Sequence, residues 1–161
     1  MPPTLATAGG RAGTVVCART LADMLPPRLQ SVVDLFSSAP KELRVQALLD
    51  YARRVPPLPD GVARDSLEQV HECQTPFFLA TWLDTDGLVR IAFDCPPESP
   101  TVRGYAGILH QGLDGETPEA ILAVPDDFYV GIGLEEVVTP QRLRGMGAIV
   151  GRLKAQVAAL G

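Results

Sequence analysis

The sequence has few cysteines, and none of them forms the closely spaced pairs that metal sites use. Its three cysteines stand at positions 17, 73 and 95, without a Cys-x-x-Cys motif. Zinc and iron–sulfur sites collect several thiolates or imidazoles, often from such pairs. We therefore expect no bound metal, no disulfide framework and the reduced thiols of a cytoplasmic protein. A small metal-binding module stays open as an alternative, with the candidate ligands His71, Cys73, Cys95 and His110.

Long apolar runs and a basic stripe are absent as well. No apolar run reaches the length of a membrane span, and no basic segment followed by an apolar one marks a secretory leader. Fifteen acidic and only three basic residues lie between Asp60 and Glu136, whereas nucleic-acid-binding surfaces are basic. We expect neither a membrane nor a nucleic acid as partner. Four basic residues follow, and we interpret them as a solvated helix face: Arg142, Arg144, Arg152 and Lys154.

The length and composition fit one globular domain. The chain has 161 residues, of which 46% are hydrophobic and 20% are charged, enough for a sizeable core. Residues 1–27 show no helical or strand period, so we expect a disordered tail in which Cys17 has no role. Residues 28–161 are expected to form the single domain. Because Met24 stands where periodicity begins, one hypothesis makes it the natural first residue.

Helical periodicity is present on both sides of the centre of the chain. Apolar spacing, with proline and Ser/Thr start signals, predicts two helices before residue 56 and several after residue 99. The second helix should bury a stripe that begins at Leu43 and ends at Val55. The last helix should present a sustained core-facing seam from Leu143 to Leu160. The expected helices cover about 29–36, 40–55, 101–112, 118–123, 125–131 and 140–160.

The centre of the chain predicts a small sheet. Residues 66–71, 77–83 and 88–94 have the composition or alternation of strands, and Asp84–Gly87 has the residues of a hairpin turn. A stiff proline-rich linker, Val55–Gly61, precedes them. The order of helices, meander and helices indicates an α+β fold, in which a three-stranded antiparallel meander packs against helices on one face.

Cys73 stands in the turn between the first two expected strands. It can be a buried structural thiol, a metal ligand or a nucleophile. His71 is near enough in sequence to act as a base, but no Gly-x-Cys-x-Gly elbow surrounds the thiol, which weakens a hydrolase interpretation. A thiol that carries sulfur needs thiolate character, shelter and access to a partner. The apolar residues after the turn could provide that shelter: Phe77, Phe78 and Leu79.

Charged residues should tune this thiol in opposite directions. Arg142 or Arg144, at the start of the last helix, could stabilise an anion on Cys73, as could the N-terminus of that helix. Glu72 should act against them, because an adjacent carboxylate raises the pKa of a thiol. Cys95 is interpreted as a small residue at the end of a half-buried strand.

Several segments in a fixed order carry a resemblance to a known family. They are the proline-rich linker, the turn Val70–Thr75, the helix segment Arg103–Leu109, and the stretches Gly115–Leu122, Asp127–Leu134 and Thr139–Met146. From about Leu29 to Leu160 the chain resembles the SufE family, sulfur acceptors in iron–sulfur cluster assembly. The resemblance implies a fold like that of SufE and of the scaffold IscU.

The resemblance also implies a function and partners. Cys73 would take a persulfide sulfur from a SufS-type cysteine desulfurase, stimulate that enzyme and pass the sulfur to an iron–sulfur scaffold. The chain would then be a sulfur-transfer accessory protein with no bound cofactor, since the PLP belongs to the desulfurase. A homodimer is considered as its assembly. The alternative is an adaptor that activates the desulfurase without carrying sulfur.

Site residues follow from the matching positions. Arg142 would dock the partner or stabilise the thiolate, and Gln74 would shape the turn. Three positions depart from the family pattern: Glu72 replaces the usual glycine, Thr75 the usual serine, and Arg144 a common asparagine. The Glu72 departure bears directly on the geometry of the turn and on the reactivity of Cys73.

Overall fold

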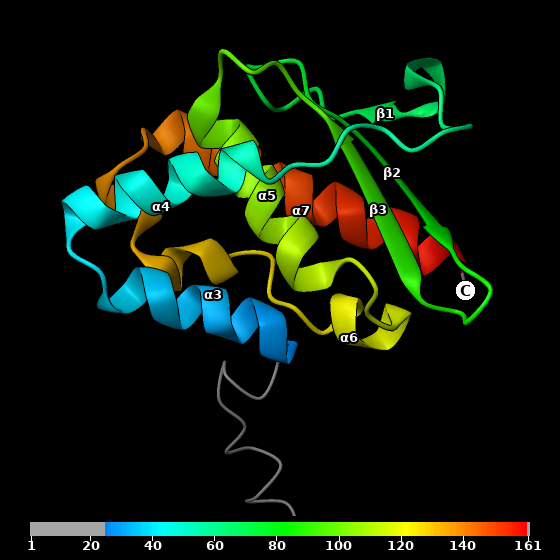
Figure 1. The fold of residues 1–161 in the computed structure, drawn as a ribbon, viewed down its shortest axis with the longest axis horizontal. Helices are drawn as coiled ribbons and strands as arrows, with labels where there is room; N and C mark the ends of the chain where they lie inside the picture. Colours follow the sequence, from blue (N-terminus) through cyan, green and yellow to red (C-terminus); the bar gives the residue numbers. More distant parts are fainter. Residues whose placement is uncertain (1–24, 161) are drawn as a thin grey trace, which may run out of the picture.

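The structure, a computed structural model, describes residues 25–160 (Figure 1). Cys17 and Met24 lie outside these residues, as does the expected tail up to residue 24. The helices are α3 (Pro27–Ser38), α4 (Lys41–Arg53), α5 (Pro100–Leu113), α6 (Pro118–Leu122) and α7 (Pro140–Leu160), with 3-10 turns η1 (Arg64–Ser66), η2 (Phe128–Ile132) and η3 (Leu134–Glu136). None of the helices in the described part of the chain is long and apolar enough to cross a membrane.

The sheet is the expected antiparallel meander, in the order β1-β2-β3. Its strands are β1 (Glu68–Gln69), β2 (Phe78–Leu83) and β3 (Val89–Asp94). The α+β prediction is confirmed, but the expected first strand, 66–71, was too long. The 3-10 turn η1 occupies its start, and a hydrogen bond from Cys73 N to Val70 O turns the chain out of the ladder at its end.

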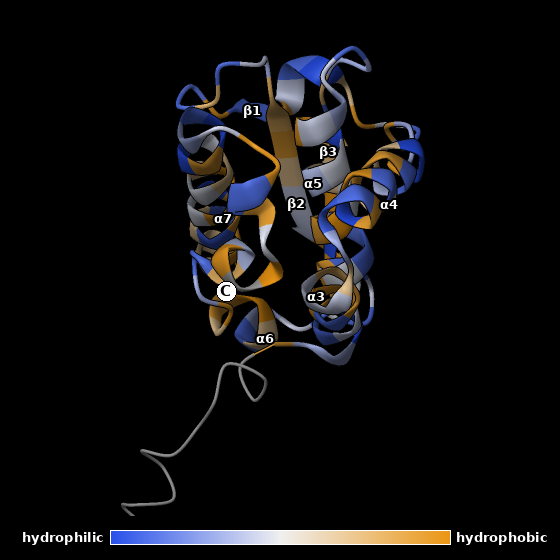
Figure 2. Ribbon diagram, turned by 90° about the vertical axis from the view of Figure 1, so that its left-hand side faces the viewer, coloured by the Kyte–Doolittle hydropathy of each residue, from blue (hydrophilic) through white to orange (hydrophobic). Residues whose placement is uncertain are grey.

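Different segments of the chain lie next to the two faces of the sheet. Leu79 of β2 pairs with Phe93 of β3, and both side chains are buried on the face toward α5 and α7. On the other face, Trp82 pairs with Arg90, and the prolines of the linker lie against this pair and line a shallow groove with it. The linker therefore borders this face together with the end of α5, whose His110 and the following Asp114 line the same groove. In the view of Figure 2, α7 lies to the left of β2, and α3 and α4 lie to its right.

Helix α4 packs on α5 at very short range. A Cβ at Gly104 or Gly107 of α5 would collide with the backbone oxygen of Leu48 or Tyr51. The burial of α4 is accordingly concentrated in its second half, and Leu43 is 56% exposed. The prediction that Leu43 belongs to the buried stripe was wrong, because the close approach of the two helices occurs further along α4.

The segment expected as a helix from residue 125 is instead formed by η2 and η3. Gly133 separates the two turns and has a φ of +75°, a left-handed conformation that ends a right-handed turn. The buried side chains of Phe128, Ile132 and Leu134 keep this irregular segment in the core. Two short 3-10 turns thus stand in place of the single helix expected over residues 125–131.

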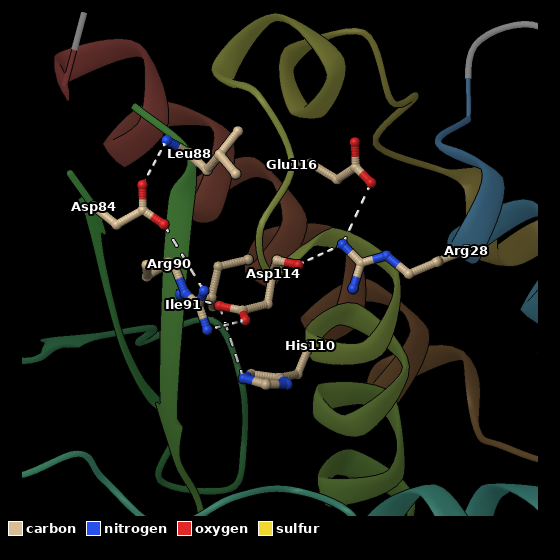
Figure 3. A network of polar contacts seen from close by, with 8 residues as sticks. All are labelled: Arg28, Asp84, Leu88, Arg90, Ile91, His110, Asp114 and Glu116. Carbon is tan, nitrogen blue, oxygen red and sulfur yellow. Dashed lines mark hydrogen bonds and ion pairs between the residues drawn. The ribbon is translucent and has the colours of Figure 1, made fainter. Parts of the chain in front are cut away.

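A polar network fixes the hairpin to the helices (Figure 3). Asp114, just after α5, accepts hydrogen bonds from Ile91 N at 2.8 Å and from Arg90 at 2.9 Å. Arg28 of α3 reaches Glu116 at 3.3 Å, which adds the first helix to the network. His110 lies 3.9 Å from Asp114, and burial lowers its pKa. His110 thus belongs to this network at the C-terminal end of α5.

Candidate functional site

Cys73 lies in a short loop that is anchored at both ends. Val70 N donates to Phe77 O at 2.8 Å, and the side chains of Val70 and Phe77 are fully buried. Between them, residues 71–76 project from the ends of β1 and β2. Pro76 suits this place because it has no N–H to donate to a ladder. The sequence thus builds a loop with firm apolar anchors and a mostly exposed tip.

The thiol is half-buried where three segments meet. Thr75 Oγ1 donates to Ser99 Oγ at 3.3 Å, which joins the loop to the segment that leads into α5. On the other side, a Cβ placed on Gly145 of α7 would lie 3.6 Å from Cys73 Sγ and 3.4 Å from its Cα. Gly145 therefore lets the loop approach α7 closely. No role was predicted for Gly145, although a glycine within a helical seam usually has a packing reason.

Burial is the main influence on the Cys73 thiol and raises its pKa. A hydrogen bond from the Thr75 backbone and the charge of Arg142 act in the opposite direction. Arg142 is held in place because its guanidinium donates to Thr101 Oγ1 at 2.8 Å. Its backbone N–H donates to Thr139 Oγ1 at 3.3 Å, so Thr139 caps the helix from which Arg142 projects. The resting thiol is therefore mainly protonated near neutral pH, with a cation close by.

Glu72 does not act on the thiol as expected. Its carboxylate binds Arg152 of α7 through both oxygens, at 2.8 and 3.0 Å, and it is not among the causes of the raised thiol pKa. Hydrogen bonding to Arg152 is the main reason that the pKa of Glu72 is lowered. Arg152 also binds Glu68 of β1 at 2.8 Å. Arg152 thus makes specific contacts with two carboxylates, which its interpretation as part of a solvated helix face did not include.

The remaining expected site residues differ in their placement. Thr75 takes part in the contacts of the loop, whereas His71, Gln74 and Arg144 are exposed. The charge of His71 acts on Glu68 and Glu72 and is not among the influences on Cys73. The structure thus does not place His71 as a base for the thiol.

Cys95 is in a different environment from Cys73. It is buried at the end of β3, and burial raises its pKa to about 11. Arg103 donates to the Cys95 carbonyl at 2.9 Å and to the Ala52 carbonyl at 3.1 Å. Arg103 therefore binds backbone oxygens of two separate segments. Within residues 25–160, no group of three or more His, Cys, Asp or Glu side chains could hold a metal ion.

The fold and the site define a class of protein: a small α+β domain that presents a half-buried thiol on a loop between antiparallel strands. Residues 30–157 match the family model described as "SufE: Fe-S metabolism associated domain". The match covers most of the chain, and the chain belongs to the SufE family. The resemblance seen in the sequence is confirmed.

Individual relatives agree with this assignment. The chain is 41% identical over 133 residues to an uncharacterized SufE-like protein of Mycobacterium tuberculosis, covering 83% of this chain and 93% of the relative. It is 28% identical over 134 residues to the cysteine desulfuration protein SufE of Plasmodium vivax, covering 81% and 53%. The solution structure of a hypothetical protein from Thermus thermophilus superimposes with a TM-score of 0.77 at 54% identity, covering 84% and 97%.

Proposed function

We propose that Cys73 accepts sulfur from a SufS-type cysteine desulfurase and passes it to an iron–sulfur scaffold. Family membership supports a sulfur-transfer role in iron–sulfur metabolism. The name of the Plasmodium relative, a cysteine desulfuration protein, supports a desulfurase as partner. The protein stimulates that enzyme and needs no cofactor of its own, because the PLP that releases sulfur from cysteine stays with the desulfurase.

The proposed step is a thiol–persulfide exchange. The Cys73 thiolate attacks the outer sulfur of the persulfide on the desulfurase, a new S–S bond forms, and the bond within the donor persulfide breaks. The donor cysteine leaves as a thiolate, and Cys73 gains one sulfur atom. The proton of Cys73 goes to solvent or to the leaving thiolate, so the exchange needs no oxidant or reductant.

The observation that carries this proposal is the half-buried thiol of Cys73 between the loop and Gly145. Partial burial shelters a reactive sulfur from water and oxidants, while the exposed loop tip leaves a route to a partner. Arg142 lies near enough to stabilise an anion on the sulfur. Cys95 meets these requirements poorly, since it is 4% exposed and its thiol has a pKa of about 11.

The rate of sulfide release from a cognate desulfurase tests this function. With PLP, cysteine and a reductant present, wild-type protein and Cys95→Ser should accelerate release, whereas Cys73→Ser should not. The alternative adaptor, which activates without carrying sulfur, is favoured by the raised pKa of the resting thiol. Undiminished acceleration by Cys73→Ser would support that adaptor and contradict the proposal.

A further inference from the structure

Few polar contacts join the Cys73 loop to the rest of the molecule. Thr75 reaches Ser99 through a hydroxyl–hydroxyl bond of 3.3 Å, which is long for its kind. The contact between Glu72 and Arg152 is stronger, because two charge-assisted bonds of 2.8 and 3.0 Å join a carboxylate to one guanidinium. Glu72 immediately precedes Cys73, so this ion pair acts directly on the part of the loop that carries the thiol.

Arg152 is already oriented before Glu72 binds it. Its other nitrogen donates to Glu68 Oε2 at 2.8 Å, and the second oxygen of Glu68 accepts from Gln156 Nε2 at 2.7 Å. Gln156 in turn accepts a hydrogen bond from Thr81 Oγ1 of β2 at 3.1 Å. A chain of contacts from the sheet thus fixes the guanidinium. An isolated surface pair is weak because two flexible side chains must be ordered, and here one partner is ordered in advance.

The pair remains accessible to solvent. The side chains of Glu72 and Arg152 are 50% and 30% exposed, respectively. Water and salt can therefore reach it, and its strength should stay in the range of partly exposed ion pairs. Such a contact is strong enough to bias the position of a loop and weak enough to break when a partner arrives.

We propose that Glu72 and Arg152 form a clamp that keeps the Cys73 loop seated on α7, with Arg152 as a positioning residue for the thiol. When the clamp opens, the loop is held by the Thr75 bond, the bond from Cys73 N to Val70 O and the packing on Gly145, so Cys73 spends more time exposed. The clamp would thereby regulate the thiol to which sulfur transfer is assigned above. Its relevance to sulfur transfer rests on that proposed function, whereas the clamp itself can be tested without a desulfurase.

The test is the rate at which iodoacetamide, a neutral reagent, alkylates Cys73, followed by the mass of the peptide that contains it. Glu72→Gln and Arg152→Gln should each raise the rate about two- to fivefold, as expected for the loss of a partly exposed ion pair. A purely electrostatic effect would have opposite signs in the two variants. Removing the carboxylate would lower the pKa of the thiol and speed alkylation, whereas removing the guanidinium would raise that pKa and slow it.

A double variant and a control sharpen the result. Glu72→Gln with Arg152→Gln should react no faster than the faster single variant, because both changes open the same clamp. Lys154→Gln removes the same charge from α7, but Lys154 pairs with Asp126, so this variant should react like wild type. Thermal unfolding of each variant checks that it is folded.

Salt provides a second measurement, which opens the clamp in the wild-type protein itself. The wild-type rate should rise with sodium chloride, while the rate of Glu72→Gln should stay nearly constant, because salt screens an exposed ion pair. Opposite effects in the two single variants, rates equal to wild type in both, or a wild-type rate insensitive to salt would each overturn the clamp. None of these outcomes would bear on whether Cys73 accepts sulfur.

Discussion

At position 145, the lack of a side chain makes room for the thiol. Gly145→Ala would place a Cβ in ordinary contact with Cys73, at 3.4 Å from its Cα, and should be tolerated. Gly145→Leu should push the loop away from α7, speed alkylation of Cys73 and lower stability by about 1–3 kcal/mol, as overpacking does. Gly151→Leu is the matched control on the same helix, because nothing lies within 4 Å of its Cβ position. Equal alkylation rates in the two leucine variants would contradict the proposed packing.

The charge of Arg142 should be visible in the pH dependence of the thiol. Burial raises the pKa of Cys73, and Arg142 opposes that rise. The midpoint of the alkylation rate against pH should therefore move to higher pH in Arg142→Gln, because the thiolate loses a nearby cation. Arg53→Gln, which removes a charge from an exposed pair in α4, should leave the midpoint in place. A midpoint that is unchanged or lower in Arg142→Gln would remove Arg142 from the thiol environment.

Sequence reasoning reached some of these residues and missed others. Cys73 and Arg142 lie in segments with a recognisable order of residue types, so both could be proposed from the chain alone. The pairing of Glu72 with Arg152 could not, because 80 residues separate the two and only the packing of the sheet on α7 brings them together. The expected effect of Glu72 on Cys73 failed for this reason, since neighbours in sequence need not interact most strongly.

Among the helices, the contact between α4 and α5 depends on glycine. Gly107→Ala should lower the free energy of unfolding by about 1–3 kcal/mol, because its Cβ would meet the backbone oxygen of Tyr51, which cannot rotate away. Where no atom lies near the added Cβ, a Gly→Ala substitution in a helix should be neutral or stabilising, since alanine favours the helix over glycine by about 1 kcal/mol. Gly151→Ala provides that comparison, and urea unfolding measures both. A Gly107→Ala protein as stable as wild type would contradict the close approach.

The predictability of each element followed its length and regularity. The seam of α7 was predicted because its period persists over many residues, and Met146, Val150, Leu153 and Val157 are buried as expected. The length of β1 and the 3-10 form of η2 and η3 were not, because they depend on single hydrogen bonds and on the conformation of Gly133. The exposure of Leu43 in the first half of α4 was also missed, since the glycines that determine where α4 is buried lie on α5.

For the molecule as a whole, the network around Arg152 predicts sensitivity to acid. The pKa of Glu68 is lowered by its hydrogen bonds to Gln156 and Arg152, and that of Glu72 by its hydrogen bond to Arg152. A carboxyl group with a lowered pKa in the folded state contributes stability that is present above its unfolded pKa. This stability is lost as the pH falls through the folded pKa. Stability should therefore decline below about pH 5, near the ordinary range of glutamate.

Arg152→Gln identifies the source of that decline. Without the guanidinium, part of the difference between folded and unfolded pKa disappears, so the variant should be less stable than wild type near pH 7 and should approach it near pH 3. Chemical denaturation at a series of pH values measures both curves. A constant difference between them over this range would assign the effect of the substitution to packing rather than to charge.

The overall architecture was the most predictable level of the molecule. The order of helices, meander and helices indicated the α+β fold, and the family resemblance was carried by segments spread over the whole domain. The proline-rich linker was interpreted as a stiff surface segment, and the structure adds that it lies against the outer face of the sheet. This role depends on the pairing of β2 with β3 and could not be inferred from the prolines alone.

The mass of the intact protein after reaction with a desulfurase tests the central claim most directly. With PLP and cysteine present, and before any reductant is added, the wild-type chain should gain about 32 Da, one sulfur atom, on the peptide that contains Cys73. Cys95→Ser should gain the same mass, and Cys73→Ser should gain none. A sulfur adduct on Cys73→Ser, or none on the wild-type chain under conditions in which the desulfurase forms its own persulfide, would contradict the assignment of Cys73 as the sulfur acceptor.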